Sequence, residues 1–335
     1  MPARFISRRR LRELLDTAPK QRVAVVGDAM LDVYLHGDVQ RISPEAPVPV
    51  VRVRERRFAL GGAANVAQNV AALGATAELV AVVGSDEGAA RLRQMLSSIG
   101  GVTRGLVTTT RPTRTKTRVV ARAQQVVRVD EETDDDCTSA EIEKITAAVT
   151  RAVRDADALI LEDYNKGVLV TKVIEHAIAA AKKKKIPVVV DPKYRNFFAY
   201  RGATIFKPNR RELEAALGAA VDVDHPATLP GLLERLGVDS ILLTLSERGM
   251  ALIERGASAT KGVHRIPTAA REVYDVVGAG DTVTAYLAAM LAGGATRLEA
   301  SVIANFAAGV EVGKLGAATA SPAEVLAAHD SDATR

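Results

Sequence analysis

Residues 275–282 read DVVGAGDT, and this stretch joins two segments of different character. It follows a β-leaning run over residues 273–277 and leads into residues 282–291, TVTAYLAAML, whose alanine-rich composition is typical of a helix. Gly278 and Gly280 stand at the junction, where the absence of a Cβ lets backbone N–H groups approach a ligand and converge on one point. A helix N-terminus there adds partial positive charge, so the stretch predicts an anion-binding cradle.

Asp281 is the unusual member of this cradle, because a carboxylate is a poor neighbour for a bound phosphate. It makes sense if it removes a proton from a hydroxyl group that attacks the phosphate, which indicates phosphoryl transfer to an alcohol. The alternative is that Asp281 caps the helix and the glycines form a tight turn. A dinucleotide fingerprint is disfavoured because it would need glycine at Val283, and no G-x-x-x-x-G-K-[ST] pattern follows.

The composition excludes several classes of protein. The 335 residues are 47% hydrophobic, enough for one large α/β domain or two smaller ones. The net charge of +5 and an aromatic content of 4% do not indicate nucleic-acid binding. Cys137 is the only cysteine, so an internal disulfide or a cysteine metal cage is impossible. Residues 7–10 read SRRR, but no apolar segment follows and no apolar run is long enough to span a membrane, so we expect a cytoplasmic protein.

Short runs of Val, Ile and Leu end in small or acidic residues and are followed by helical segments. The runs cover residues 23–27, 78–84, 158–161, 187–190, 204–206 and 240–245. This alternation predicts an α/β fold with a mostly parallel sheet covered by helices on both faces. Ligands bind at the carboxyl ends of such strands, where polar residues recur in this chain. We expect a single domain over residues 1–330 and a disordered tail at residues 331–335.

Two segments interrupt the alternation, at about residues 33–58 and 106–129. In the second, basic and polar side chains fall on even positions, which share one face of a β-strand. They are Arg114, Lys116, Arg118, Arg122, Gln124 and Arg128. One interpretation is a solvated strand face, and the other is a lid strand that grips an anionic group. We predict that both segments form a small β-sheet added to the main domain.

Two signatures together resemble those of the ribokinase-like carbohydrate kinases, also called the PfkB family. DVVGAGDT matches the C-terminal signature, and residues 61–74, GGAANVAQNVAALG, resemble the N-terminal one, a Gly-Gly turn that opens a helix. Two signatures in the right order are more specific than either alone, and the resemblance covers roughly residues 22–321. It implies a ribokinase-like three-layer fold with a small β-sheet lid, and a sugar kinase that uses ATP and Mg²⁺.

Three further stretches resemble the bacterial D-glycero-β-D-manno-heptose-7-phosphate kinases. They are residues 27–51, GDAMLDVYLHGDVQRISPEAPVPVV, residues 122–130, RAQQVVRVD, and residues 162–169, EDYNKGVL. The resemblance implies phosphorylation of the anomeric hydroxyl to give the 1,7-bisphosphate, a precursor of the lipopolysaccharide inner core. The chain ends soon after the kinase signatures, so we expect the stand-alone form without the fused nucleotidyltransferase. The alternatives are another kinase of the family, a non-catalytic sugar-responsive binding protein on the same fold and, more remotely, a nicotinamide oxidoreductase.

The resemblance also implies roles for single residues in catalysis and sugar binding. Asp281 becomes the catalytic base, and Gly278, Ala279 and Gly280 supply amides to the transferring phosphoryl group. The sugar-side candidates are Asp32, Gly61, Gly62 and Asn65. Asp28 could act instead as a turn cap, and Asn65 could be an ordinary polar residue on a helix face.

A substrate that already carries a phosphate needs cations far from the base. Lys116, Arg118, Arg122 and Arg128 are the candidates, with Gln124 for hydroxyl groups, because arginine suits bidentate phosphate contact. Lys193 and Asp163 follow predicted strands and are further candidates for substrate binding. A salt-bridged turn is the alternative for Asp163 and for its neighbour Lys166.

The remaining candidates concern the nucleotide and the metal. Asn209 and Glu212 form N-x-x-E, which reads as a helix capping box, yet the family uses this motif near Mg²⁺, and one motif can serve both purposes. The implied nucleotide contacts are Ser246, Glu247, Gly249, Gly278, Gly280, Asn209 and Asn305. Exposed lid edges invite pairing, so we expect a homodimer through the lid, with ATP and a phosphosugar as the other partners.

Overall fold

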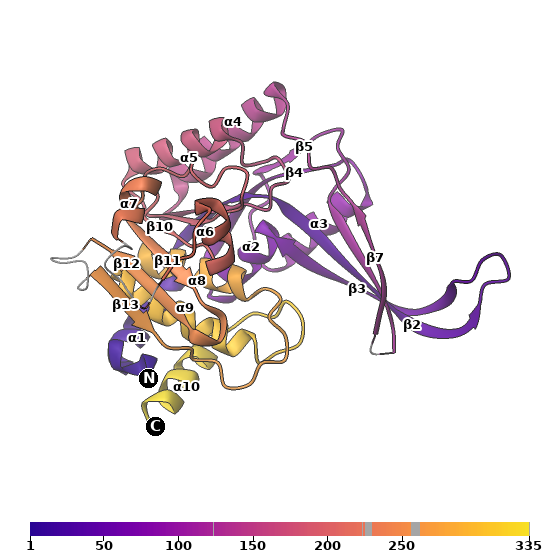
Figure 1. Ribbon diagram of the computed structural model, residues 1–335. Helices are drawn as coiled ribbons and strands as arrows, with labels where there is room; N and C mark the ends of the chain where they lie inside the picture. Colours follow the sequence, from indigo (N-terminus) through magenta and orange to yellow (C-terminus); the bar gives the residue numbers. More distant parts are fainter. Residues whose placement is uncertain (123, 223, 225–229, 256–261, 335) are drawn as a thin grey trace.

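The computed structural model describes residues 1–122, 124–222, 224, 230–255 and 262–334. Its body is built on one large sheet (Figure 1). The strand order of this sheet is β13-β12-β11-β10-β9-β8-β1-β4-β5. The strands are β1 (Arg22–Gly27), β4 (Thr76–Val83), β5 (Leu106–Thr108), β8 (Ala158–Glu162), β9 (Val188–Asp191), β10 (Ile205–Phe206), β11 (Ser240–Thr244), β12 (Met250–Glu254) and β13 (Val263–Ile266). Along this spatial order, each strand from β11 across to β5 pairs in parallel with its neighbour, and β12 and β13 add an antiparallel edge beside β11.

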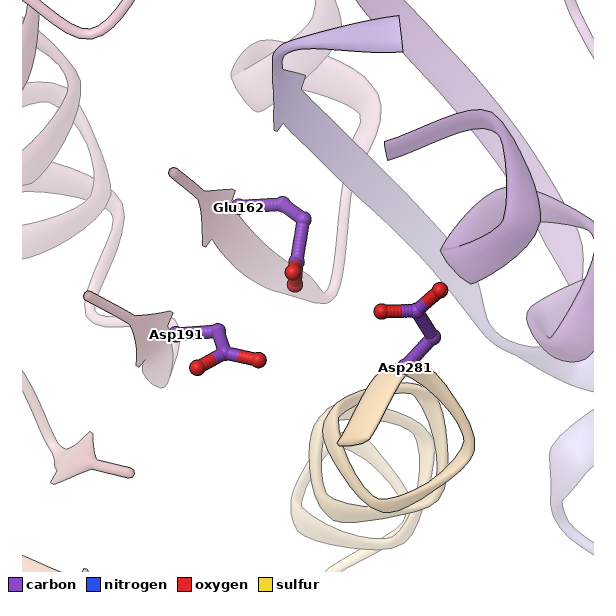
Figure 2. Close-up of side chains that lie close together, drawn as sticks. All are labelled: Glu162, Asp191 and Asp281. Carbon is purple, nitrogen blue, oxygen red and sulfur yellow. The ribbon is translucent and has the colours of Figure 1, made fainter. Parts of the chain in front are cut away.

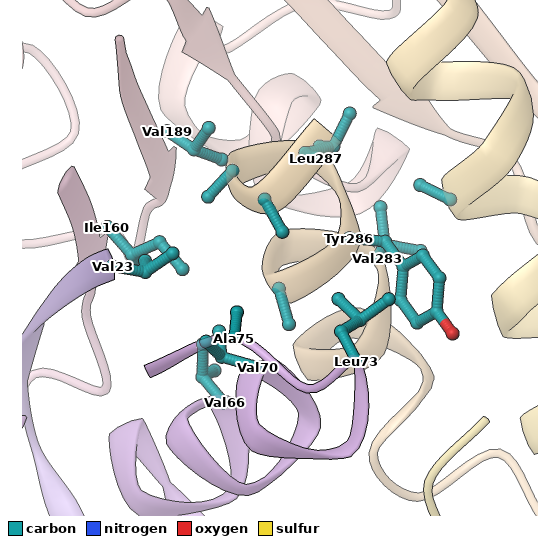
Figure 3. Packing of buried hydrophobic residues seen from close by; sticks show 14 of the residues in the cluster. Val23, Val66, Val70, Leu73, Ala75, Ile160, Val189, Val283, Tyr286 and Leu287 are labelled. Carbon is teal, nitrogen blue, oxygen red and sulfur yellow. The ribbon is translucent and has the colours of Figure 1, made fainter. Parts of the chain in front are cut away.

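Helices cover both faces of this sheet, as the apolar strands predicted. One layer holds α1 (Arg8–Leu15), α2 (Ala63–Ala72), α3 (Glu87–Ser98), α8 (Ala279–Ala292), α9 (Arg297–Glu311) and α10 (Pro322–Ala333). The other holds α4 (Ser139–Asp155), α5 (Thr171–Lys184), α6 (Arg210–Leu217) and α7 (Pro230–Leu236). Alternate residues of one strand face opposite layers. Val23 packs toward α2 and α8 (Figure 3), whereas Ala24 belongs to the apolar cluster that includes residues of α4 and α5. The predicted three-layer α/β fold is therefore confirmed.

A second, four-stranded sheet forms the lid, with the order β3-β2-β6-β7. It is made of β2 (Ala29–Ile42), β3 (Pro49–Gly62), β6 (Thr115–Ala121) and β7 (Gln124–Glu131), and the β2–β3 hairpin projects well beyond the body (Figure 1). The two predicted segments thus meet in one sheet, but their bounds were wrong. The lid strands begin earlier at residue 29 and end later at residues 62 and 131. Residues 106–108 are not part of the lid, because β5 pairs with β4 at the edge of the main sheet.

The prediction that the even-numbered basic and polar side chains share one face of the lid is confirmed only in part. Lys116 and Arg118 lie on one face of β6, and Arg128 lies opposite Arg118 in the register. A register shift between Val119 and Val120 then places Gln124 opposite Ala121, on the other face. Arg122 adopts a φ of 57° between β6 and β7, outside either strand.

The C-terminal segment differs from the expected disordered tail. Helix α10 continues through Ala333 and starts at a capping box formed by Ser321 and Glu324. Asp332 is buried, and its Oδ2 accepts a hydrogen bond of 2.9 Å from the backbone N–H of Ala3. Arg335 lies outside the described residues. Within the described part of the chain, no helix combines the length and apolar character that crossing a membrane requires.

Candidate active site

The GAGD stretch forms the start of helix α8. Gly278 is the N-cap with a φ of 97°, which favours glycine, and a Cβ there would lie 3.2 Å from both Asn65 Nδ2 and Glu311 Oε1. Asp281 lies in the first turn, so it is not the N-cap residue that one interpretation of the sequence had made it. The predicted cradle, a glycine turn opening a helix N-terminus, is present.

Two side chains hold the carboxylate of Asp281. Asn65 Nδ2 donates a hydrogen bond of 2.6 Å to Oδ2, and the Tyr164 hydroxyl donates one of 3.0 Å to Oδ1. Burial raises the pKa of Asp281 to about 6, the two hydrogen bonds oppose this rise, and the charge of Asp191 adds to it. A carboxylate with this pKa can take up a proton near neutral pH, which suits a general base. Asn65 was predicted for the sugar, and Tyr164 was not predicted at all.

Asp281 belongs to a carboxylate cluster with Glu162 and Asp191 (Figure 2). Ligand oxygens of the three side chains lie within 4.8 Å of one another. Glu162 ends β8 and Asp191 ends β9, so neighbouring parallel strands deliver them to the same sheet edge. Burial, together with the charges of Asp191 and Asp281, raises the pKa of Glu162 well above its usual value. Both residues directly follow apolar runs in the sequence, and this signal could have identified them.

The sugar-side candidates gather between the lid and α2. Asp32 on β2 forms an ion pair with Arg118 on β6, and the position of a Cβ on Gly61 is only 2.7 Å from Asp32 Oδ2. Gly62 has a φ of 56° and caps α2, where a Cβ would collide with the carbonyl oxygen of Asp28. Asp28 is fully buried and accepts backbone hydrogen bonds from the loop after β8. Asp28 therefore organises that loop, whereas the partly exposed Asp32 is the one of the two that can meet a ligand.

The lid cations are engaged with lid carboxylates. Lys116 pairs with Asp130 and Glu132, and Arg128 also pairs with Asp130. A phosphate arriving at this face would compete with partly exposed carboxylates for these cations.

The loop after β8 forms the salt-bridged turn that was one of the two interpretations. Lys166 pairs with Glu132 and Asp134. Asp163 is buried beneath the loop and accepts hydrogen bonds from the Tyr200 hydroxyl and the backbone N–H of Asn165, each 2.7 Å long. The structure therefore does not place Asp163 against a substrate, because its carboxylate is used to shape the loop.

The N-x-x-E motif forms the expected capping box at the start of α6. Asn209 Oδ1 accepts from the backbone N–H of Glu212, and Glu212 Oε2 accepts from that of Asn209, each over 2.9 Å. Glu212 Oε1 accepts from Lys193, whose ammonium also lies 5.5 Å from the centre of the Tyr164 ring. Lys193 thus lies between Glu212 of the motif and Tyr164, whose hydroxyl donates to Asp281.

A cavity of about 410 Å³ lies beside the start of α8. Its lining includes five residues predicted for the nucleotide: Ser246, Glu247, Gly249, Gly280 and Asn305. Most of the remaining lining is apolar, from residues such as Met250, Val283 and Val312. The cavity has the size and apolar character of a small-ligand site. Asn305 donates to the carbonyl oxygen of Pro267 over 2.8 Å, which fixes one wall.

Residues 20–324 match the protein family described as pfkB family carbohydrate kinase. The chain belongs to this family. It is a pfkB-family sugar kinase, and membership of this family implies the use of ATP. The family that the two signatures predicted is therefore confirmed.

Curated relatives of this pfkB-family chain carry the name bifunctional protein HldE. The relative from Citrifermentans bemidjiense is 44% identical over 98% of this chain and 68% of its own length. The relative from Gluconacetobacter diazotrophicus is 47% identical over 93% of this chain and 65% of its own length. The chain thus spans about two thirds of these relatives.

Solved structures show the same fold at low identity. Ribokinase of Arabidopsis thaliana, complexed with ribose and ATP, aligns with a TM-score of 0.71 at 21% identity over 92% of this chain and 98% of its own. The tetrameric inhibited form of Escherichia coli phosphofructokinase-2 aligns with a TM-score of 0.75 at 18% identity over 94% of this chain and 100% of its own. The pfkB-family chain therefore has the ribokinase fold that the sequence predicted.

Proposed function

We propose that this kinase phosphorylates D-glycero-β-D-manno-heptose 7-phosphate at the anomeric hydroxyl, giving the 1,7-bisphosphate and ADP. The observation that carries the proposal is the position of Asp281 in the first turn of α8, directly after Gly280, which lines the cavity, and in a hydrogen bond with Asn65 of α2. The stretches shared with heptose-7-phosphate kinases and the HldE relatives support this substrate.

In this reaction Asp281 takes the proton of the anomeric hydroxyl, since each carboxylate oxygen can accept a second hydrogen bond beside those from Asn65 and Tyr164. The sugar oxygen forms a bond to the γ-phosphorus, the bond to the β–γ bridging oxygen breaks, and ADP leaves. The amides of Gly278, Ala279 and Gly280 stabilise the transferring group at the helix N-terminus. Mg²⁺, when bound, would offset the negative charge of the nucleotide phosphates.

The lid would hold the other end of the sugar. Asp32 accepts hydrogen bonds from sugar hydroxyls, and Arg118, Lys116 and Arg128 are the cations available to the distal phosphate. Closure of the lid over the sugar would exclude water and limit hydrolysis of ATP.

We also propose a cytoplasmic homodimer that joins through the lid. β7 is an edge strand of the lid sheet, and its Val127 and Val129 are exposed. The product would serve as a precursor of the lipopolysaccharide inner core.

A panel of sugars in an ADP-release assay tests the substrate. The proposal predicts the highest kcat/KM for the heptose 7-phosphate, above hexose phosphates and unphosphorylated sugars, with Asp281→Asn as the inactive control. A higher kcat/KM for another sugar would favour a different kinase of the family. Thermal stabilisation by sugars without any ADP release would favour a non-catalytic binding protein.

A further inference from the structure

The carboxylate cluster carries more negative charge than its neighbours neutralise. Glu162, Asp191 and Asp281 bring three carboxylates together. Among the residues that the structure describes, one ammonium forms an ion pair with them, that of Lys207 at 2.8 Å from Asp191 Oδ2. The nearby Lys193 is paired with a fourth carboxylate outside the cluster. With all groups ionised, three negative charges against one positive charge leave an excess of two. A single divalent cation would balance this excess.

Glu162 is the member of the cluster that lacks partners. It is 0% exposed, and neither of its carboxylate oxygens has a hydrogen-bond partner among the residues that the structure describes. Figure 2 shows its carboxylate pointing into the space between Asp191 and Asp281. A buried carboxylate without a partner is costly, so such a group takes up either a proton or a cation.

The N-x-x-E motif offers a contrast. Both oxygens of Glu212 and the side-chain oxygen of Asn209 already accept hydrogen bonds. A cation bound there would have to displace Lys193 or open the capping box of α6. The oxygens of Glu162 require no such displacement.

The cluster also lies where a nucleotide-linked cation would be useful. A Cβ on Gly280 would sit 3.6 Å from Asp191 Oδ2 and 3.6 Å from Lys207 Nζ, and Gly280 lines the cavity beside α8. Mg²⁺ prefers oxygen ligands and is usually held by one or two carboxylates, with water or phosphate oxygens completing its octahedron. Glu162 and Asp191 fit this pattern and leave Asp281 available for the sugar hydroxyl.

We infer that Glu162 and Asp191 directly hold a divalent cation, Mg²⁺ or Mn²⁺, between the nucleotide cavity and Asp281. This inference rests on the proposed function, because the cation would serve the nucleotide phosphates. The motif of Asn209 and Glu212 then caps α6 and does not supply the ligands.

Mn²⁺ binding to the full chain, without nucleotide or sugar, tests the inference by electron paramagnetic resonance and calorimetry. The wild type should bind one Mn²⁺, and Glu162→Gln and Asp191→Asn should each weaken that binding at least tenfold. Glu212→Gln should bind Mn²⁺ like the wild type. Glu311→Gln is a matched control, because Glu311 is likewise fully buried without hydrogen-bond partners for its carboxylate oxygens among the described residues, yet lies outside the cluster.

Unchanged Mn²⁺ binding in Glu162→Gln, or loss of binding in Glu212→Gln alone, would overturn the inference. So would a wild type that binds no Mn²⁺ without nucleotide. Circular dichroism shows whether Glu162→Gln and Asp191→Asn fold like the wild type. If one of the two variants fails to fold, the Mn²⁺ affinity of the other variant tests the inference. Because no sugar is present, failure of the heptose as a substrate would leave this result standing, and the two proposals can fail separately.

Discussion

Removing the hydroxyl of Tyr164 should change how turnover depends on pH. That hydroxyl donates to Asp281 Oδ1 over 3.0 Å and so stabilises the ionised form of the base. A hydrogen bond to a charged group contributes about 1.5–3 kcal/mol, and about 1.4 kcal/mol corresponds to a factor of ten. Tyr164→Phe should therefore raise the pKa of Asp281 above its value of about 6. Below that pH, where little of the base is ionised, turnover should fall about 10- to 100-fold.

The assay is kcat at saturating ATP, Mg²⁺ and phosphosugar, measured by ADP release between about pH 5 and 9. The acidic limb of the Tyr164→Phe profile should move to higher pH, and turnover should approach that of the wild type at the alkaline end. Tyr200→Phe is the control, because it removes another buried phenol that donates to a carboxylate, Asp163, without contact to Asp281. Superimposable limbs, or a loss of equal size at every pH, would refute the reasoning.

Other changes have separate outcomes. Asp281→Asn should lower kcat by about 10²–10⁴ while calorimetry shows unchanged ATP affinity, and near-normal turnover would exclude Asp281 as the base. Arg118→Ala should raise KM for the phosphosugar about tenfold or more, since it removes a charge-assisted contact, and an unchanged KM would remove Arg118 from substrate binding. Glu162→Gln should raise the melting temperature of the metal-free protein more at pH 8 than at pH 5. The raised pKa of Glu162 means that the folded wild type loses stability as pH rises above the usual glutamate range, and an equal gain at both pH values would contradict this.

The sequence predicted the features that local chemistry determines. The glycine turn that opens α8 and the N-x-x-E capping box both form where the residues indicated. Strand-end polar residues meet at one edge because the strands are parallel and their continuous apolar runs are buried on both faces.

Contacts between distant segments could not be predicted in the same way. Asn65 and Tyr164 reach Asp281 from 216 and 117 residues away, and no local pattern encodes that convergence. The register shift in the β6–β7 hairpin breaks the period of two on which the placement of Gln124 depended. The polar C-terminal end suggested disorder, but Asp332 accepts a hydrogen bond from the backbone N–H of Ala3, a contact with the distant N-terminus.

Phosphorus nuclear magnetic resonance of the product tests the central claim most directly. With ATP, Mg²⁺ and the heptose 7-phosphate, the wild type should produce ADP and a sugar with a second phosphate whose phosphorus couples to the anomeric proton. Asp281→Asn should form this product about 10²–10⁴ times more slowly. A phosphate attached to any other carbon, or an unchanged sugar while ATP is consumed, would contradict the account.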